Sequence, residues 1–251
     1  MRRIRVLAGV VVATLAAGGT GCAASPPAPP VTVFAAASLK PVFAEIAELF
    51  KAQNPGAAVD LNFGGSADLA VQLTQGAEAD VFASANTTQM DKVADAGLLA
   101  GKAVPFAANT LVIVTAPGNP KRVASFADLA RPGLTVVVCQ EPVPCGAAAQ
   151  KIQARTGVRI SPVSEEPDVT DVLNKVTTGQ ADAGLVYQTD AAYAGDRAAT
   201  VTFPEAADAV NTYPIAVLKN APRADLGQKF VDLVTGATGQ RALGAAGFAK
   251  P

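Results

Sequence analysis

The chain has 251 residues, half of them hydrophobic, and a formal net charge of −1. This composition is typical of one or two globular domains with an ample core, and it excludes a partner bound through strong charge, such as a nucleic acid. The chain contains no histidine, which excludes His-based general base catalysis and His-ligated metal sites, and with them most hydrolase mechanisms.

Residues 1–21 have the pattern of an export signal. Three arginines precede an apolar run over residues 6–17, which is shorter than the about 20 residues that a membrane-spanning helix needs. Small residues then lead to Cys22, as in bacterial lipoprotein processing sites, although Gly19 stands where such sites usually carry leucine. We therefore expect lipid attachment at Cys22 and a Pro/Ala tether over residues 22–30. A plain secreted protein, or cleavage elsewhere, is the alternative.

The first predicted elements are a strand over residues 31–37 and an amphipathic helix after Ser38. Apolar residues follow at three- and four-residue spacing as far as Phe50, so one helix face is buried and Ser38 stands at the N-cap. A helix start offers unpaired N–H groups and the positive end of the dipole, and the alanines before it let a ligand come close. The junction therefore indicates an anion site. An ordinary N-cap serine is the alternative interpretation.

The same construction follows once more. A second strand over residues 58–63 leads through two glycines to Ser66 and a helix that ends near Gly76. At the carboxyl ends of adjacent parallel strands, two such junctions face one crevice, where ligands bind in open α/β sheets.

Two stretches share a pattern of glycine, Ala-Asp and an apolar strand, residues 76–84 and 179–187. This echo suggests two lobes of similar construction, although common helix-to-strand loop chemistry is the alternative. The buried strands 110–115 and 213–218 are the candidates for the two crossings between the lobes.

The middle and last parts of the chain contain further predicted elements. A strand over residues 134–139 runs into a loop with two cysteines, and a helix covers residues 145–152. The next helix has Asp168 as its N-cap. Residues 224–243 form a C-terminal helix that packs on the first lobe, with a break at Gly239.

Cys139 and Cys145 flank the short Pro-containing loop. Export places them in an oxidising compartment, so we expect a disulfide, with two free thiols as the alternative. Because the closed loop is small, its main role would be to fix the shape of this segment.

Residues 31–251 resemble the periplasmic molybdate-binding proteins of ABC transporters. Four motifs carry the resemblance, at residues 33–39, 63–69, 79–85 and 184–190. It implies an α/β fold of the type II periplasmic binding protein class, in which two similar lobes are joined by two crossing strands and enclose the ligand. The expected division is 31–108 plus 219–251 for the first lobe and 109–218, including the crossing strands, for the second.

The resemblance also implies a ligand set made only of neutral donors. The family's two serine ligands fall on Ser38 and Ser66, through hydroxyl and backbone N–H, and its tyrosine ligand falls on Tyr187. Two backbone N–H donors fall on Cys145, where the family often has alanine, and on Val169. The implied ligand is molybdate, and also tungstate, with no cofactor and no free metal cation.

The resulting prediction is a binding protein rather than an enzyme. It is exported, monomeric and lipid-anchored to the outer face of the cytoplasmic membrane, and it delivers molybdate to a membrane permease driven by a cytoplasmic ATPase. A receptor for sulfate or another tetrahedral oxyanion is the close alternative. A hydrolase with Ser38 or Ser66 as nucleophile would need a lysine base such as Lys40. A lipoprotein that uses the fold for protein contacts would show a large exposed apolar patch and a collapsed cleft.

Overall fold

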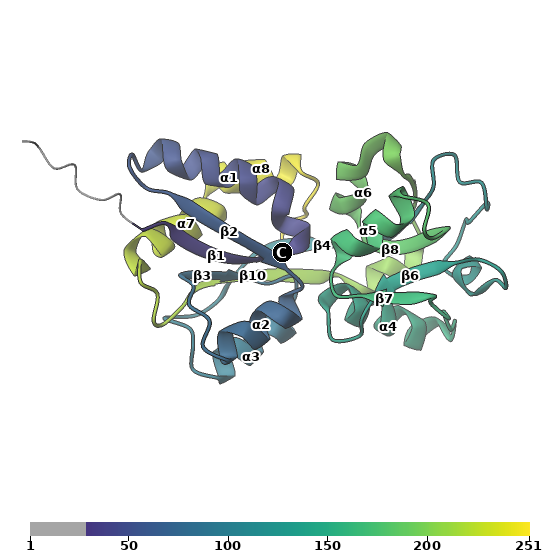
Figure 1. The fold of residues 1–251 in the computed structure, drawn as a ribbon, viewed down its shortest axis with the longest axis horizontal. Helices are drawn as coiled ribbons and strands as arrows, with labels where there is room; N and C mark the ends of the chain where they lie inside the picture. Colours follow the sequence, from purple (N-terminus) through teal and green to yellow (C-terminus); the bar gives the residue numbers. More distant parts are fainter. Residues whose placement is uncertain (1–28) are drawn as a thin grey trace, which may run out of the picture.

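The computed structural model describes residues 29–251, which form two α/β lobes placed side by side (Figure 1). Each lobe is built on a five-stranded mixed sheet. In spatial order, the first sheet contains β2 (Val59–Gly64), β1 (Val31–Ala36), β3 (Val81–Ala83), β10 (Asn211–Val217) and β4 (Val104–Asn109). The second contains β7 (Ser164–Glu166), β6 (Val136–Cys139), β8 (Ala183–Tyr187), β5 (Leu111–Thr115) and β9 (Ala199–Val201).

Helices cover both faces of each sheet. Those of the first lobe are α1 (Lys40–Gln53), α2 (Ser66–Thr74), α3 (Thr87–Asp95), α7 (Ala224–Thr235) and α8 (Ala237–Ala245). Those of the second are α4 (Pro144–Thr156), α5 (Val169–Thr177) and α6 (Gln188–Ala194). Short 3₁₀ turns complete the chain: η1 (Ala37–Leu39), η2 (Ala127–Ala130), η3 (Gly195–Arg197) and η4 (Pro204–Ala209).

The two lobes repeat one construction, as predicted. In each sheet three parallel strands are followed by an antiparallel strand in fourth place, β10 in the first and β5 in the second. The Ala-Asp turns also make the same kind of hydrogen bond in both lobes. Asp80 accepts the N–H of Thr32 at 2.8 Å, and Asp182 accepts the N–H of Thr135 at 2.9 Å, so each aspartate ties its turn to the first strand of its own three-strand unit.

The C-terminal helices pack back on the first lobe, also as predicted. Phe230 of α7 makes edge contacts with Phe43 and Phe50 of α1, at ring-centroid distances of 5.8 and 5.6 Å. The break between the helices is at Gly236 and not at Gly239, which lies inside α8. A Cβ on Gly239 would lie 2.3 Å from the carbonyl oxygen of Leu233, so this glycine permits the close turn of α8 onto α7 instead of ending a helix.

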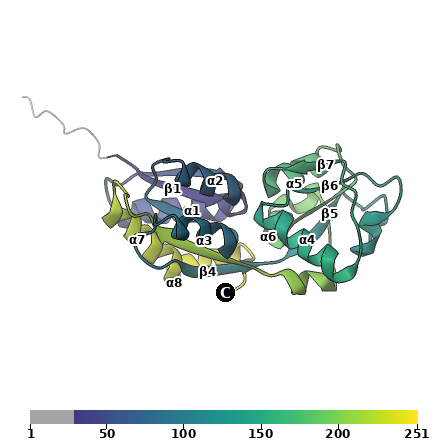
Figure 2. The ribbon, with the colours of Figure 1, turned by 90° about the horizontal axis from the view of Figure 1, so that it is seen from below.

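The chain passes between the lobes at two neighbouring places (Figure 2). One is Thr110, between β4 and β5, and the other is the η4-to-β10 connection. Asn109 and Asn211 stand opposite each other where the two crossings meet the first sheet. β5 lies in the second sheet, and β10 is hydrogen-bonded into the first sheet. The predicted lobe division instead counts β10 with the second lobe. The lobe bounds themselves stay a prediction.

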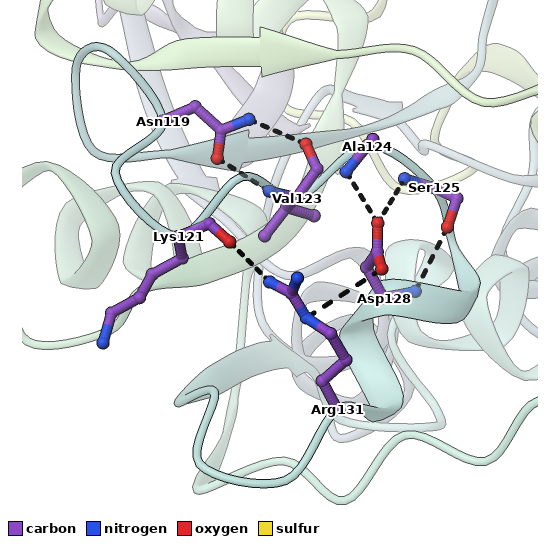
Figure 3. A network of polar contacts seen from close by, with 7 residues as sticks. All are labelled: Asn119, Lys121, Val123, Ala124, Ser125, Asp128 and Arg131. Atoms are coloured by element: carbon purple, nitrogen blue, oxygen red, sulfur yellow. Dashed lines mark hydrogen bonds and ion pairs between the residues drawn. The ribbon is translucent and has the colours of Figure 1, made fainter.

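The long connection from β5 to β6 is held by its own polar contacts at the end of the second lobe remote from the first (Figures 1 and 3). The Asn119 side chain both accepts the N–H of Val123 and donates to its carbonyl oxygen, at 2.9 and 2.7 Å. Arg131 donates to the carbonyl oxygen of Lys121 at 2.6 Å. These contacts fix the loop away from the space between the lobes.

The predicted export signal and the lipid-attachment residue Cys22 lie outside the described residues. Across residues 29–251, no helix combines the length and the apolar character needed to cross a membrane.

Candidate functional site

The five predicted ligand-binding residues all line one cavity between the two lobes. Its wall comes from the start of η1, the β2-to-α2 junction, the starts of α4 and α5, and the end of β8. The lining residues are Ala36, Ala37, Ser38, Gly64, Gly65, Ser66, Ala85, Val143, Pro144, Cys145, Asp168, Val169 and Tyr187. Thus strand-to-helix junctions of both lobes meet at one point.

The cavity is small. About 10 Å³ of it is open to the centre of a water molecule, whereas pockets for drug-sized organic ligands measure about 300–1,000 Å³. The centres of the four oxygens of a tetrahedral oxyanion span only a few cubic ångströms. In this closed arrangement the space suits such an ion and excludes a sugar or a peptide.

Ser38 does not cap a helix, so this part of the prediction is wrong. The chain tightens into the 3₁₀ turn η1 before Pro41, α1 begins at Lys40, and Leu39 holds the N-cap position. The buried Ser38 hydroxyl instead lies 3.0 Å from the hydroxyl of Tyr213, a fully buried residue of β10. Its oxygen is therefore held at the cavity wall by a side chain and not by the helix backbone.

Ser66 is the first residue of α2, and Gly65 holds the N-cap position. The Ser66 hydroxyl oxygen accepts the backbone N–H of Ala85 at 3.0 Å. A hydroxyl has one hydrogen, and this contact does not use it. The Ser66 O–H is thus left to donate into the cavity.

Tyr187 ends β8 and is 1 % exposed. Burial raises the pKa of its hydroxyl well above the usual value, with the neighbouring Tyr213 and Asp190 adding to the effect. The group therefore stays protonated and remains a hydrogen-bond donor at any physiological pH.

Cys145 and Val169 contribute helix starts. Val169 is the first residue of α5, and Cys145 is the second residue of α4, after Pro144. First-turn N–H groups have no acceptor within their own helix and carry the positive end of its dipole. Asp168 caps α5 as predicted, accepting the N–H groups of Thr170 and Asp171 at 2.7 and 3.0 Å.

The lining contains no lysine or arginine, and Asp168 is its one acidic residue. Neutral donors from several elements can hold an anion when they are fixed before it binds, because little reorganisation is then required. The arrangement is therefore suited to an oxyanion bound by hydrogen bonds alone.

A disulfide joins Cys139 at the end of β6 to Cys145 in the first turn of α4, with an Sγ–Sγ distance of 2.04 Å. Next to it, a Cβ on Gly146 would lie 1.9 Å from the carbonyl oxygen of Gln140, so only glycine allows the helix start to come this close to the loop. The bond thus fixes the segment that carries the Cys145 N–H.

Several contacts hold the lobes together around the cavity. Gln89 of α3 donates through Nε2 to the carbonyl oxygen of Pro142 at 2.6 Å, and Asn109 donates through Nδ2 to the Thr189 hydroxyl at 2.8 Å. Gly65 faces Pro167 so closely that a Cβ there would lie 2.3 Å from the Pro167 carbonyl oxygen. The lobes are thus in contact at these three places.

Comparison with known proteins identifies this architecture. The profile of the bacterial extracellular solute-binding proteins matches residues 31–249. The chain belongs to this family. It is 57 % identical, over the full length of both chains, to the molybdate-binding protein ModA of Mycobacterium tuberculosis.

Two solved structures support the solute-binding fold. The periplasmic molybdate-binding protein of Azotobacter vinelandii has a TM-score of 0.76 and 22 % identity, covering 88 % of this chain and 99 % of its own. The sulfate-binding protein SubI of Mycobacterium tuberculosis has a TM-score of 0.76 and 20 % identity, covering 88 % and 86 %. The predicted two-lobe fold is confirmed, and these two likenesses do not by themselves choose between the anions.

Membership of the solute-binding family makes the chain an extracytoplasmic binding protein and not an enzyme. The site agrees with this result. Lys40, the base that a serine hydrolase would need, is exposed at the start of α1, and the Ser38 hydroxyl is paired with Tyr213. The large exposed apolar side chains of the described residues come from separate segments of the chain: Val71, Val104, Val163, Tyr193 and Val210.

Sequence reasoning missed the residues that lie behind the candidate site and contact its side chains. Asn211 donates through Nδ2 to the Tyr187 hydroxyl at 2.6 Å, and Tyr213 contacts Ser38. For Tyr213 the available sequence signal was its place in the predicted crossing strand 213–218, whereas Asn211 lies two residues before that strand. Asp190, inside the last predicted motif, is buried and accepts the Tyr187 N–H at 3.0 Å. Burial raises the pKa of its carboxyl to about 7.

Proposed function

We propose that this protein captures molybdate, and tungstate with it, outside the cytoplasm and delivers it to an ABC importer. The observation that carries the proposal is the small cavity at converging helix starts, lined by Ser38, Ser66 and Tyr187 without a single basic side chain. The 57 % identity to a protein named for molybdate binding supports the choice of ion.

The proposed ligand set has hydroxyl donors from Ser38, Ser66 and Tyr187, and backbone N–H donors from Cys145 and Val169. Such a set suits an anion that carries no proton at neutral pH. A protonated phosphate would place its O–H against donors and leave one of them unsatisfied, which costs binding free energy. Because all five proposed ligand groups are donors, we expect the site to discriminate against phosphate.

The remaining parts of the proposal concern the membrane. The mature protein is held at the outer face of the cytoplasmic membrane through a lipid on Cys22, works as a monomer, and presents the ion to a permease driven by a cytoplasmic ATPase. Release then requires only that the two lobes separate, because nothing covalent holds the ion.

The test is calorimetric titration of residues 23–251 with molybdate, tungstate, sulfate and phosphate. We expect one-to-one binding of molybdate and tungstate, no binding of phosphate, and weakening by about 10- to 100-fold in Ser38→Ala and in Tyr187→Phe, since each removes a hydrogen bond to a charged group. Sulfate binding in place of molybdate would move the assignment to a sulfate receptor on the same scaffold. Absence of heat with every oxyanion would refute the proposal.

A further inference from the structure

We propose that Asn211 is a positioning residue that points the hydroxyl hydrogen of Tyr187 into the cavity. This inference rests on the proposed function. It concerns how Asn211, the first residue of β10, sets the affinity for the oxyanion. Asn211 does not line the cavity, so it acts through Tyr187.

The direction of the Asn211 amide follows from its two contacts. Its Nδ2 atom lies 3.2 Å from the carbonyl oxygen of Pro144 and 2.6 Å from the hydroxyl oxygen of Tyr187. A carbonyl oxygen only accepts, so the NH₂ group and not the amide oxygen must face Pro144. The same NH₂ group therefore donates to Tyr187.

The bond from Asn211 limits where the Tyr187 hydroxyl can donate. Its oxygen accepts from Asn211, so its single hydrogen must point to another acceptor. The Tyr187 ring is buried and packs against that of Tyr213 with 5.9 Å between centroids. The Tyr213 hydroxyl, which contacts Ser38 and also interacts with the Tyr187 hydroxyl, is the protein acceptor that a bound ligand has to replace. The cavity, which Tyr187 lines, is where a ligand oxygen can accept that hydrogen.

The contact also joins the two lobes. Asn211 belongs to a strand of the first sheet, whereas Tyr187 and Pro144 belong to elements of the second lobe. Pro144 directly precedes Cys145, so the same amide anchors the chain beside a second proposed donor. One side chain at the crossing thus contacts Tyr187 and the segment that carries the Cys145 N–H.

Asn109 offers a matched control. It stands opposite Asn211 in the β4–β10 pair and also sends its amide across to the second lobe, but its acceptor there is the Thr189 hydroxyl, which does not line the cavity. Asn109 also interacts with the Tyr213 hydroxyl, which contacts Ser38, so its link to the cavity does not use the contact between Asn211 and Tyr187. A general effect of losing a crossing asparagine should appear at both positions. An effect through Tyr187 should appear only at Asn211.

The experiment is a double-mutant cycle with molybdate, measured by calorimetry on the purified protein. Asn211→Leu keeps the branched arrangement of four heavy atoms and removes the donors. We expect it to weaken binding about 10-fold in the wild-type background and less than about 3-fold when Tyr187→Phe is already present, because the hydroxyl it orients is then gone. Asn109→Leu should have the same effect in both backgrounds.

The outcomes separate the two proposals. An equal loss from Asn211→Leu in both backgrounds, or no loss in either, would overturn the positioning role while leaving molybdate binding intact. Absence of molybdate binding by the wild-type protein would overturn the proposed function and this inference with it. Thermal unfolding without ligand checks that each variant is folded, and Asn211→Ala takes the place of Asn211→Leu in the cycle if the latter is not.

Discussion

Replacing Gly65 by alanine should block closure of the lobes without harming either lobe. Gly65 has φ −60° and ψ 130°, which alanine adopts freely. The added methyl group would lie 2.3 Å from the carbonyl oxygen of Pro167 in the opposite lobe. The strain therefore exists only while the two lobes are in contact.

The size of the effect follows from this clash. Overpacking of a close contact costs about 1–3 kcal/mol, and each 1.36 kcal/mol corresponds to about a tenfold change in an equilibrium constant. We expect Gly65→Ala to bind molybdate about 5- to 150-fold more weakly. The free energy of unfolding without ligand should change by less than about 1 kcal/mol, because losing glycine at the N-cap and reducing unfolded-state entropy have opposite effects.

Calorimetry gives the affinity, and small-angle X-ray scattering with and without molybdate gives the compaction on binding. Gly101→Ala is the matched control, since a Cβ there meets no atom within 4 Å. If Gly65→Ala binds as tightly as the wild type and compacts to the same extent, then the liganded lobes do not close on Pro167 and the reasoning is refuted.

Three further predictions concern the site and its support. Ser66→Ala removes one donor and leaves the Ala85 N–H unpaired, so molybdate affinity should fall about 10- to 100-fold in calorimetry; unchanged affinity would exclude the hydroxyl as a ligand. Replacing Cys139 and Cys145 by serine should lower the free energy of unfolding in urea by about 2 kcal/mol, the value for a short closed loop; equal stability would contradict this estimate. The pKa of Asp190 is raised from 3.8 to about 7, so between these values the folded state holds a proton that the unfolded state has lost. The stability from this group is present below about pH 4 and is lost as the pH rises through 7. Asp190→Asn, followed by urea unfolding across this range, should flatten the dependence, and an unaltered profile would assign it to other groups.

The fold was predictable because its signals are local and repeated. The strand-to-helix junctions at Ser38 and Ser66, the Ala-Asp turns and the periodicity of α1 are all read within windows of about ten residues. Even the cap at Asp168 depends only on the next three positions. Such features do not need the rest of the molecule to be known.

The wrong predictions concern residues whose contacts are made with distant parts of the chain. Ser38 faces Tyr213, 175 positions away, and this contact could not be weighed against capping from the sequence. Gly239 permits a close approach between α7 and α8, and the sequence cannot distinguish this use of glycine from a helix break. Asn211 was missed for the same reason, since nothing in its neighbours indicates that its partner is Tyr187.

The way the proposed ligand set is divided between the lobes has a consequence for transport. Ser38 and Ser66 belong to one half, and Cys145, Val169 and Tyr187 to the other. Neither half holds the full complement, and neither supplies a fixed positive charge that would retain the ion once the halves part. Tight capture is then a property of the closed shape alone. A permease that separates the two lobes would leave each lobe with only part of the proposed ligand set, so the affinity for the ion would fall. This step needs no energy-consuming chemistry at the receptor itself.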